Sequence, residues 1–400
     1  MPDSSIHRQI TECALRLAPL DGSNVELVRE YCTYPDIYFS DPEKFAPYMF
    51  FFDGVQFHYP PDTSYAPLYR YWDAAGGIMH RTVSFVNENF RHVTAGFRFY
   101  IERIVRNFRQ NDPEEGKKYL GCLLHMLEDS CFGLHALEGA GGADAFFLDR
   151  LTDGPVQPSA IMARLKYRDD FPKLDYSPRP LGNSPEEMVM KLYAAYCAAS
   201  ADSRKCCFRY ILNTLENRPE HNREPENRMY ANTVKLCADV IHTVSRLGRG
   251  ETRPAEPCRL EELEPYEFPF GGFGGYRFRS FVRNCAFDRE NNAVPLELDC
   301  GKFEHGLSFG THADGRLRYF IAPGIYRKFT CRIGLHPISP AGGNAEITWF
   351  NAGKAVRTDI LDPAVRSLEI GIPEPGKEFG LSFRSDPSCG ILVLADPVLQ

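Results

Sequence analysis

Two patterns of apolar residues divide the sequence. From residue 26 to about residue 247, apolar residues recur at the three- and four-residue spacing of amphipathic helices. Beyond residue 276, short segments alternate apolar and polar residues between turns rich in Gly, Pro, Asn and Asp, for example at 317–321, 329–335, 345–350 and 390–394. This second pattern is typical of a β-sandwich. The sequence therefore predicts a multidomain protein, with an all-α helical bundle followed by an all-β, jelly-roll-like sandwich.

Boundary residues mark several of the predicted helices. Ser184-Pro185, followed by Glu187, predicts the start of a helix that continues through 188–199, because it combines an N-cap serine, proline at the first helical position and a capping-box glutamate. A run at 228–247 stops at Gly248, which we interpret as a C-cap. Two further helices are predicted at 97–108 and 117–127.

The composition changes after residue 248. A polar stretch is followed by an acidic segment at 261–264 and a Gly- and Phe-rich segment at 268–276. We therefore expect a helical domain at 1–250, a linker at 251–275 and a β-sandwich domain at 276–400. Apolar residues make up 43% of the chain, which is enough to fill two cores.

Charge and cysteine content limit the partners and the compartment. The net charge is -7 with cations scattered along the chain, so the sequence does not favour duplex nucleic acid as a partner. The 13 cysteines show no Cys-x-x-Cys pair, which favours buried thiols in a reducing compartment. No signal peptide and no transmembrane run is visible, so we expect a cytoplasmic protein, or an extracellular one if a leader was removed.

One stretch carries residues suited to metal binding. His125 and Asp129 lie four residues apart on a predicted helix face, His135 follows, and Asp149 and Asp153 repeat the four-residue spacing. Imidazoles and carboxylates are the usual ligands where zinc keeps a position open for water. A lone His-x-x-x-Asp pair also fits a polar pair beside the core, and the histidine that follows favours the metal site.

This pattern resembles the zinc-dependent phospholipase C and single-strand nuclease family, whose signature is a helix reading His-x-x-x-Asp followed by a second histidine. The resemblance implies an all-helical zinc phosphoesterase with two or three zinc ions. Asp149 stands where the family has a histidine, and an aspartate can still bind zinc. The amino-terminal tryptophan of the family is absent here.

The resemblance also implies a set of ligands. One ion would be held by Asp36, His58 and His125, a second by His135, Asp149 and Asp153, and a third by His7 with the terminal amine, while Asp129 would bridge the ions. Asp41 and Asp53 remain alternatives to Asp36. Asp36 would ligate a metal or help to orient and deprotonate the attacking water, which makes it the catalytic candidate.

The function implied is hydrolysis of a phosphodiester, such as a phospholipid or a glycan-linked phosphate, by metal-activated water. Two alternatives stay open. One is a single-strand nuclease or 3'-nucleotidase. The other is a degenerate, non-catalytic helical domain that acts with the β-sandwich as a binding or structural protein.

The C-terminal region resembles the carbohydrate-binding (NPCBM-like) module that is often appended to bacterial glycosidases. The matching residues are at 306–312, 317–320 and 326–335, with the closing Ala395-Asp396-Pro397. The resemblance implies a carbohydrate partner. A β-sandwich that only supports the helical domain or mediates dimerisation is the alternative.

Overall fold

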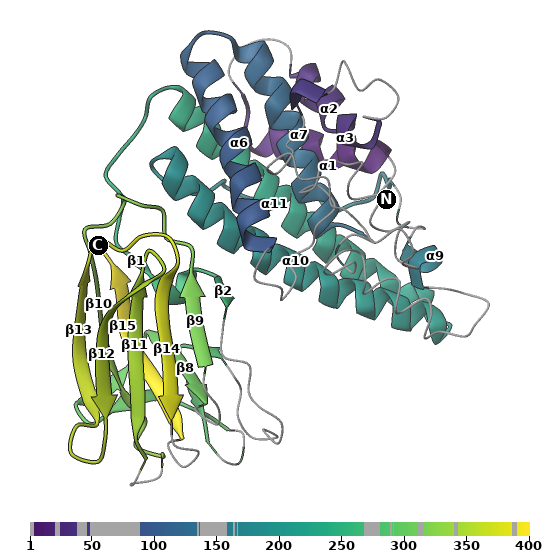
Figure 1. Cartoon of the computed structure of the whole chain (residues 1–400). Helices are drawn as coiled ribbons and strands as arrows, with labels where there is room; N and C mark the ends of the chain where they lie inside the picture. The colour runs from purple at the N-terminus through teal and green to yellow at the C-terminus, as the bar shows by residue number, and fades with distance from the viewer. Residues whose placement is uncertain are drawn as a thin grey trace, which may run out of the picture. The chain divides into compact units, whose positions relative to one another are not determined.

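The computed structural model describes residues 4–20, 25–37, 46–48, 89–133, 136, 158–162, 165, 167–267, 281–288, 290, 292–310, 315–339, 343–385 and 390–400. The chain divides into two compact units, Met1–Arg253 and Pro254–Gln400. Helices form the first unit and antiparallel sheets form the second, so the predicted fold class is confirmed (Figure 1). Within the described residues, no helix is both long and apolar enough to cross a membrane.

The helical unit is a bundle around α7. Its described helices are α1 (Ser4–Leu17), α2 (Glu26–Tyr31), α3 (Tyr34–Ile37), η2 (Ala46–Tyr48), α6 (Asn89–Arg109), α7 (Pro113–Cys131), α9 (Pro158–Met162), α10 (Pro185–Leu215), η5 (Pro219–Asn222) and α11 (Arg223–Gly248). Helix α7 packs against α1, α2, α6, α10 and α11. Every residue from 120 to 131 is consequently buried, so polar side chains on this part of α7 lie in the interior of the unit.

The N-cap predicted at Ser184 is confirmed, and Asp112 is a second N-cap that was not predicted from the sequence. The Ser184 hydroxyl accepts a hydrogen bond from the backbone N–H of Glu187 at 3.2 Å, and Glu187 in turn accepts one from the backbone N–H of Asn183 at 2.8 Å. Asp112 caps α7 in the same way, accepting from the N–H of Glu115 at 3.3 Å. These side chains satisfy N–H groups that have no partner within their own helix.

The predicted C-cap at Gly248 is wrong. Helix α11 includes Gly248, and Gly250 is the residue with a left-handed backbone, at φ 79°. A Cβ at Gly248 would lie 2.6 Å from the Cβ of Phe108 on α6. Gly248 therefore allows α6 and α11 to approach closely, and the turn is made two residues later.

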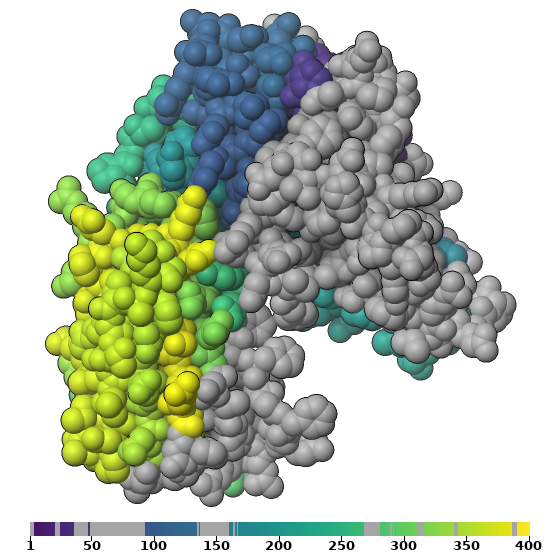
Figure 2. Space-filling view, in the orientation of Figure 1, coloured from purple at the N-terminus to yellow at the C-terminus, as the bar shows by residue number. Residues whose placement is uncertain are grey.

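The second unit is a β-sandwich of two larger sheets with two small hairpins. Its strands are β1 (Cys258–Arg259), β2 (Pro265–Glu267), β3 (Val282–Arg283), β4 (Ala286–Phe287), β5 (Ala293–Val294), β6 (Leu296–Leu298), β7 (Gly301–Phe303), β8 (Gly306–Gly310), β9 (Gly315–Tyr319), β10 (Lys328–Leu335), β11 (Ala345–Asn351), β12 (Lys354–Leu361), β13 (Ser367–Pro373), β14 (Phe379–Ser385) and β15 (Ile391–Leu399). One large sheet has the order β13-β10-β15-β8-β3 with β1 on β15, and the other has the order β12-β11-β14-β9-β2. The face of this unit that Figure 2 shows is built mainly from the last strands, coloured yellow-green to yellow.

Aromatic side chains fill the space between the two large sheets. Phe329 of one sheet lies 5.7 Å from Trp349 and 4.8 Å from Phe379 of the other, measured between ring centroids. All three side chains are buried. Part of the range that we expected to be a linker, 251–275, belongs to this sandwich, because β1 pairs with β15 and β2 pairs with β9.

The cysteines behave as small apolar residues. All described cysteines are free thiols, and all but Cys285 and Cys300 are buried. Burial raises the pKa of the thiols that line the helical core, for example at Cys122 and Cys131. These groups are therefore protonated at neutral pH, as expected for thiols used in packing.

Candidate metal centre

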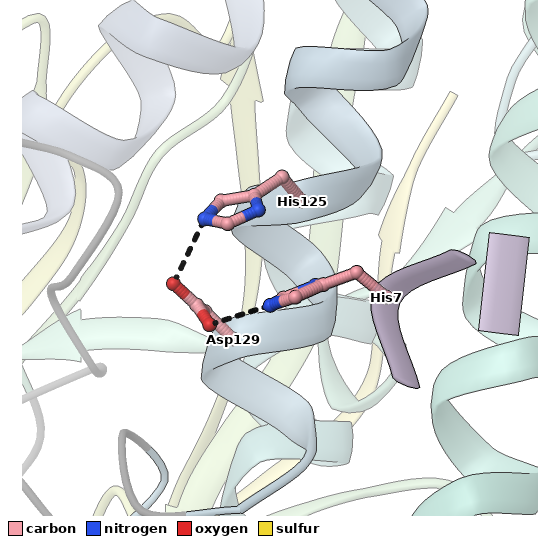
Figure 3. A group of neighbouring side chains, drawn as sticks. All are labelled: His7, His125 and Asp129. Carbon is pink, nitrogen blue, oxygen red and sulfur yellow. Dashed lines mark ion pairs between the residues drawn. The ribbon is translucent and has the colours of Figure 1, made fainter. Parts of the chain in front are cut away.

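Three polar side chains meet inside the helical unit. Helix α7 places His125 and Asp129 one turn apart on the same face, and α1 brings His7 against them (Figure 3). Asp129 directs one oxygen to each ring: Oδ2 lies 3.1 Å from His125 Nε2, and Oδ1 lies 3.4 Å from His7 Nε2. The two imidazole rings are stacked, with 4.3 Å between their centroids.

The second nitrogen of each ring has its own partner. His125 Nδ1 donates to the backbone carbonyl of Cys32 at 2.7 Å, and His7 Nδ1 lies 2.8 Å from Glu128 Oε2. Histidines that bind metals are usually held in this way, because a hydrogen bond at one nitrogen fixes the tautomer and aims the other. Both Nε2 atoms therefore face the carboxylate of Asp129 in the orientation that a shared cation requires.

Burial makes the electrostatics of this cluster strong. The side chains of His7, Glu128 and Asp129 are fully buried. Burial opposes a charged imidazole at His7, but hydrogen bonds and charges from Asp129 and Glu128 outweigh it and raise the pKa of His7 from 6.5 to about 10. Without a metal, both ring nitrogens of His7 are therefore protonated at neutral pH and the ring is positively charged. A cation bound at Nε2 would displace the proton from that nitrogen.

The donor atoms suit a zinc ion. One ligand atom each from His7, His125 and Asp129 lies within 4.8 Å of the others. Zinc binds imidazole nitrogen and carboxylate oxygen at about 2.0–2.2 Å, so these atoms need to move little to surround one ion. Nitrogen and oxygen donors together with a buried carboxylate fit zinc better than calcium or magnesium, which prefer oxygen ligands.

The structure brings together three of the eight residues suggested by the sequence, namely His7, His125 and Asp129. The backbone of Asp36 lies in α3, which packs against α7, but its side chain is outside the described part of the structure. The other four positions also lie outside the described residues: His58, His135, Asp149 and Asp153. The predicted ions that depend on them stay predictions.

Sequence reasoning missed three groups that hold the cluster: the Glu128 carboxylate, the Thr11 hydroxyl and the Cys32 carbonyl. A backbone carbonyl leaves no trace in a sequence. Glu128 did leave one, because it is a charged residue in a mostly apolar helix segment, with Leu124 and Phe132 at its i±4 positions. A buried carboxylate of this kind needs a partner from another element.

A glycine connects helix packing to the geometry of the site. A Cβ at Gly121 of α7 would lie 2.7 Å from both the Cβ of Tyr31 and the carbonyl oxygen of Val28 in α2. The Cys32 carbonyl that accepts from His125 follows directly after α2. The close approach of α2 to α7 therefore sets the position of the His125 ring.

We expect Gly121→Ala to weaken zinc binding by about tenfold and to destabilise the unit by about 1–3 kcal/mol, because the added methyl group displaces α2. Gly116→Ala is the matched control, since its Cβ would meet the side chain of Phe108 at 2.5 Å rather than α2. Zinc affinity measured by chelator competition should fall only for the first variant. Equal affinities in both variants would show that α2 does not position His125.

No protein-family model and no curated protein matches the sequence. Alpha toxin from Clostridium absonum is a similar solved structure, with 11% identity, a TM-score of 0.32, and coverage of 100% of this chain and 94% of that chain. CBM51 from Clostridium perfringens GH95, solved in complex with methyl-galactose, is 14% identical with a TM-score of 0.29, covering 36% of this chain and 100% of that chain.

CBM51-2 with INT domains from Clostridium perfringens ZmpB, in complex with GlcNAc, is 12% identical with a TM-score of 0.28. That match covers 37% of this chain and 32% of that chain, so this chain spans about a third of its length. Solved structures that resemble the chain thus include an alpha toxin over the whole chain and CBM51 modules over part of it. All of these TM-scores lie below 0.5, so the likenesses do not define a function for this chain.

Proposed function

We propose that the helical unit is a zinc-dependent phosphoric ester hydrolase and that His7, His125 and Asp129 form part of its metal centre. The observation that supports this is the convergence of two imidazole Nε2 atoms on one buried carboxylate, with all donor atoms within 4.8 Å. Three such ligands leave positions open for water and substrate.

The chemistry of the centre follows from this donor set. Bound zinc would lower the pKa of a coordinated water toward neutrality and neutralise the charge of a phosphate group. The chain's own residues prepare this: His7 and His125 present Nε2, and Asp129 directs one oxygen toward each ring, so that these three side chains would hold the ion between them. Asp36 is proposed to ligate or to orient the attacking water.

The substrate we propose is a phosphodiester, either a phospholipid or a glycan-linked phosphate. The resemblance of the His125–Asp129 helix to zinc phospholipases C favours the former. The resemblance of the sandwich to carbohydrate-binding modules favours a glycan-linked phosphate. Both substrates contain the same reacting group, so the metal centre would serve either one.

A non-catalytic helical domain is the second candidate, and one observation favours it. The imidazole of His7 lies between Glu128 and Asp129, and its raised pKa of about 10 means that a proton alone can offset part of their buried negative charge. These side chains can therefore hold one another in place without a metal, as a buried polar cluster beside the core.

The test is hydrolysis of bis(p-nitrophenyl) phosphate, p-nitrophenylphosphorylcholine and single-stranded DNA by the full chain, with and without a chelator. We expect chelation to abolish phosphodiester hydrolysis, added zinc to restore it, and His125→Ala to lower the rate by more than about 100-fold. His242→Ala is the control, because His242 is a half-buried histidine of α11 outside the cluster.

Each outcome separates the candidates. Hydrolysis that survives both chelation and His125→Ala would overturn the proposed centre. Zinc binding without hydrolysis of any of the substrates would support the non-catalytic domain. A preference for single-stranded DNA over p-nitrophenylphosphorylcholine would turn the assignment toward a nuclease.

A further inference from the structure

The two histidines of the cluster are alike at Nε2 but different at Nδ1. Both Nε2 atoms face Asp129, at 3.1 Å for His125 and 3.4 Å for His7. At Nδ1, His125 meets a neutral backbone carbonyl, whereas His7 meets the carboxylate of Glu128 at 2.8 Å. A carboxylate partner makes an imidazole a more basic and more firmly oriented ligand than a carbonyl does.

Glu128 is itself fixed from the helix that carries His7. Its second oxygen, Oε1, accepts a hydrogen bond from the Thr11 hydroxyl at 2.5 Å, and Thr11 lies one turn after His7 on α1. Glu128 of α7 thus contacts α1 at two successive turns, through His7 and Thr11. All three side chains are fully buried, which excludes water as a competing partner and strengthens both interactions.

Charge balance gives Glu128 a second role. A divalent cation buried beside Asp129 would meet only one negative charge from that ligand, and uncompensated charge in a protein interior is costly. Glu128, the preceding residue, supplies a second negative charge. Its carboxylate contacts Nδ1 of His7, on the other side of the ring from Nε2. Among the described residues, Asp129 and Glu128 together match the charge of one zinc ion.

We propose that Glu128, held in place by Thr11, is the positioning residue of the His7 side of the centre, and that it raises zinc affinity by fixing Nδ1–H of His7 and balancing the charge of the ion. This rests on the proposed metal centre. Glu128 acts through His7 and binds no metal itself. The His125 side, held by the Cys32 carbonyl, is independent of it.

The experiment compares zinc affinities of the full chain by competition with a chromogenic chelator, together with the absorption spectrum of the cobalt-substituted protein. We expect Glu128→Gln to weaken binding by about 10- to 100-fold and to change the cobalt spectrum, while Thr11→Val has a smaller effect in the same direction. Glu187→Gln is the control, because Glu187 is an equally buried glutamate that caps α10 and lies outside the cluster.

A double-mutant cycle with His7→Ala separates positioning from a merely structural role. If Glu128 acts mainly through His7, Glu128→Gln should cost much less affinity once the imidazole is gone, because only the attraction between its charge and the ion then remains. The same loss of affinity in both backgrounds would overturn the proposal.

The remaining outcomes distinguish this proposal from the metal centre itself. If the Glu128→Gln variant binds zinc as tightly as the parent protein, the proposed role of Glu128 is overturned and the proposed metal centre is not. A folded parent that binds neither zinc nor cobalt would overturn the proposed centre, and the role of Glu128 with it.

Discussion

Asparagine in place of Asp129 is expected to remove zinc from the helical unit and to abolish phosphodiester hydrolysis. The two carboxylate oxygens lie 3.1 Å from His125 Nε2 and 3.4 Å from His7 Nε2, so both sides of the centre depend on this one group. An amide keeps the volume but loses the charge and replaces one oxygen with an NH₂ group that cannot bind a cation. Because changing a group that only orients a ligand already costs 10- to 100-fold, we expect Asp129→Asn to cost more than about 100-fold in affinity.

The measurement is zinc per chain after gel filtration without added metal, beside the rate of bis(p-nitrophenyl) phosphate hydrolysis. Asp239→Asn is the matched control: Asp239 is a half-buried aspartate of α11 that accepts hydrogen bonds from the Tyr176 hydroxyl at 2.9 Å and the Arg179 N–H at 2.7 Å. This variant should retain both zinc and activity. If Asp129→Asn retained them equally well, Asp129 would have no part in binding metal.

The helical face of the centre is accessible to sequence reasoning because its geometry is local. A spacing of four residues places His125 and Asp129 on one side of any α-helix, whatever surrounds it. The run of apolar residues before His125 also indicates that this helix is buried, which the structure confirms for residues 120–131. What the spacing alone leaves open is whether the pair faces a metal or only the core.

The contribution of α1 to the site is not local in sequence. His7 could be predicted only from the family resemblance. His7 is separated from Glu128 by 121 residues, and no periodicity in the sequence relates the two. Thr11 and the Cys32 carbonyl belong to the same class, since each matters only because α1 and α2 pack against α7. Such contacts are set by tertiary packing, which neither propensity nor hydrophobic pattern encodes.

Glycines show the same distinction within the fold. Gly248 has the position of a helix C-cap in the sequence, but its missing side chain serves the contact with Phe108, and Gly250 makes the turn. Gly121 also lies within a helix, where glycine lowers stability. It is needed there because Val28 and Tyr31 of α2 leave no room for a Cβ. In both cases the reason for the glycine is a neighbouring helix that is distant in sequence.

The strands were easier to locate than the edges of the sandwich. The alternating segments predicted at 329–335 and 345–350 coincide with β10 and β11, where buried and less buried residues alternate. The strands β1 and β2 lie in the range predicted as a linker, because two or three residues carry too little alternation to indicate a strand. Their partners on β15 and β9 lie far along the chain, so only the folded sheets identify them.

Zinc is expected to raise the unfolding temperature of the helical unit and to leave that of the β-sandwich unchanged. A ligand that binds only the folded state stabilises it by about 4 kcal/mol when its free concentration is 1,000 times its Kd. For a unit the size of Met1–Arg253, this corresponds to a rise of roughly 10 °C. The described donor atoms of the cluster all belong to this unit, so the sandwich has no share in the effect.

Calorimetry of the full chain with and without zinc should therefore show two transitions, of which one moves. The thiols provide a reason for a smaller shift than the ideal value, because the many cysteines buried in the helical unit become zinc ligands once it unfolds. Asp129→Asn is the control that separates specific from general effects, since it removes the folded site and keeps every cysteine. A zinc-dependent rise that persists in this variant, or that moves both transitions together, would contradict a site built from His7, His125 and Asp129.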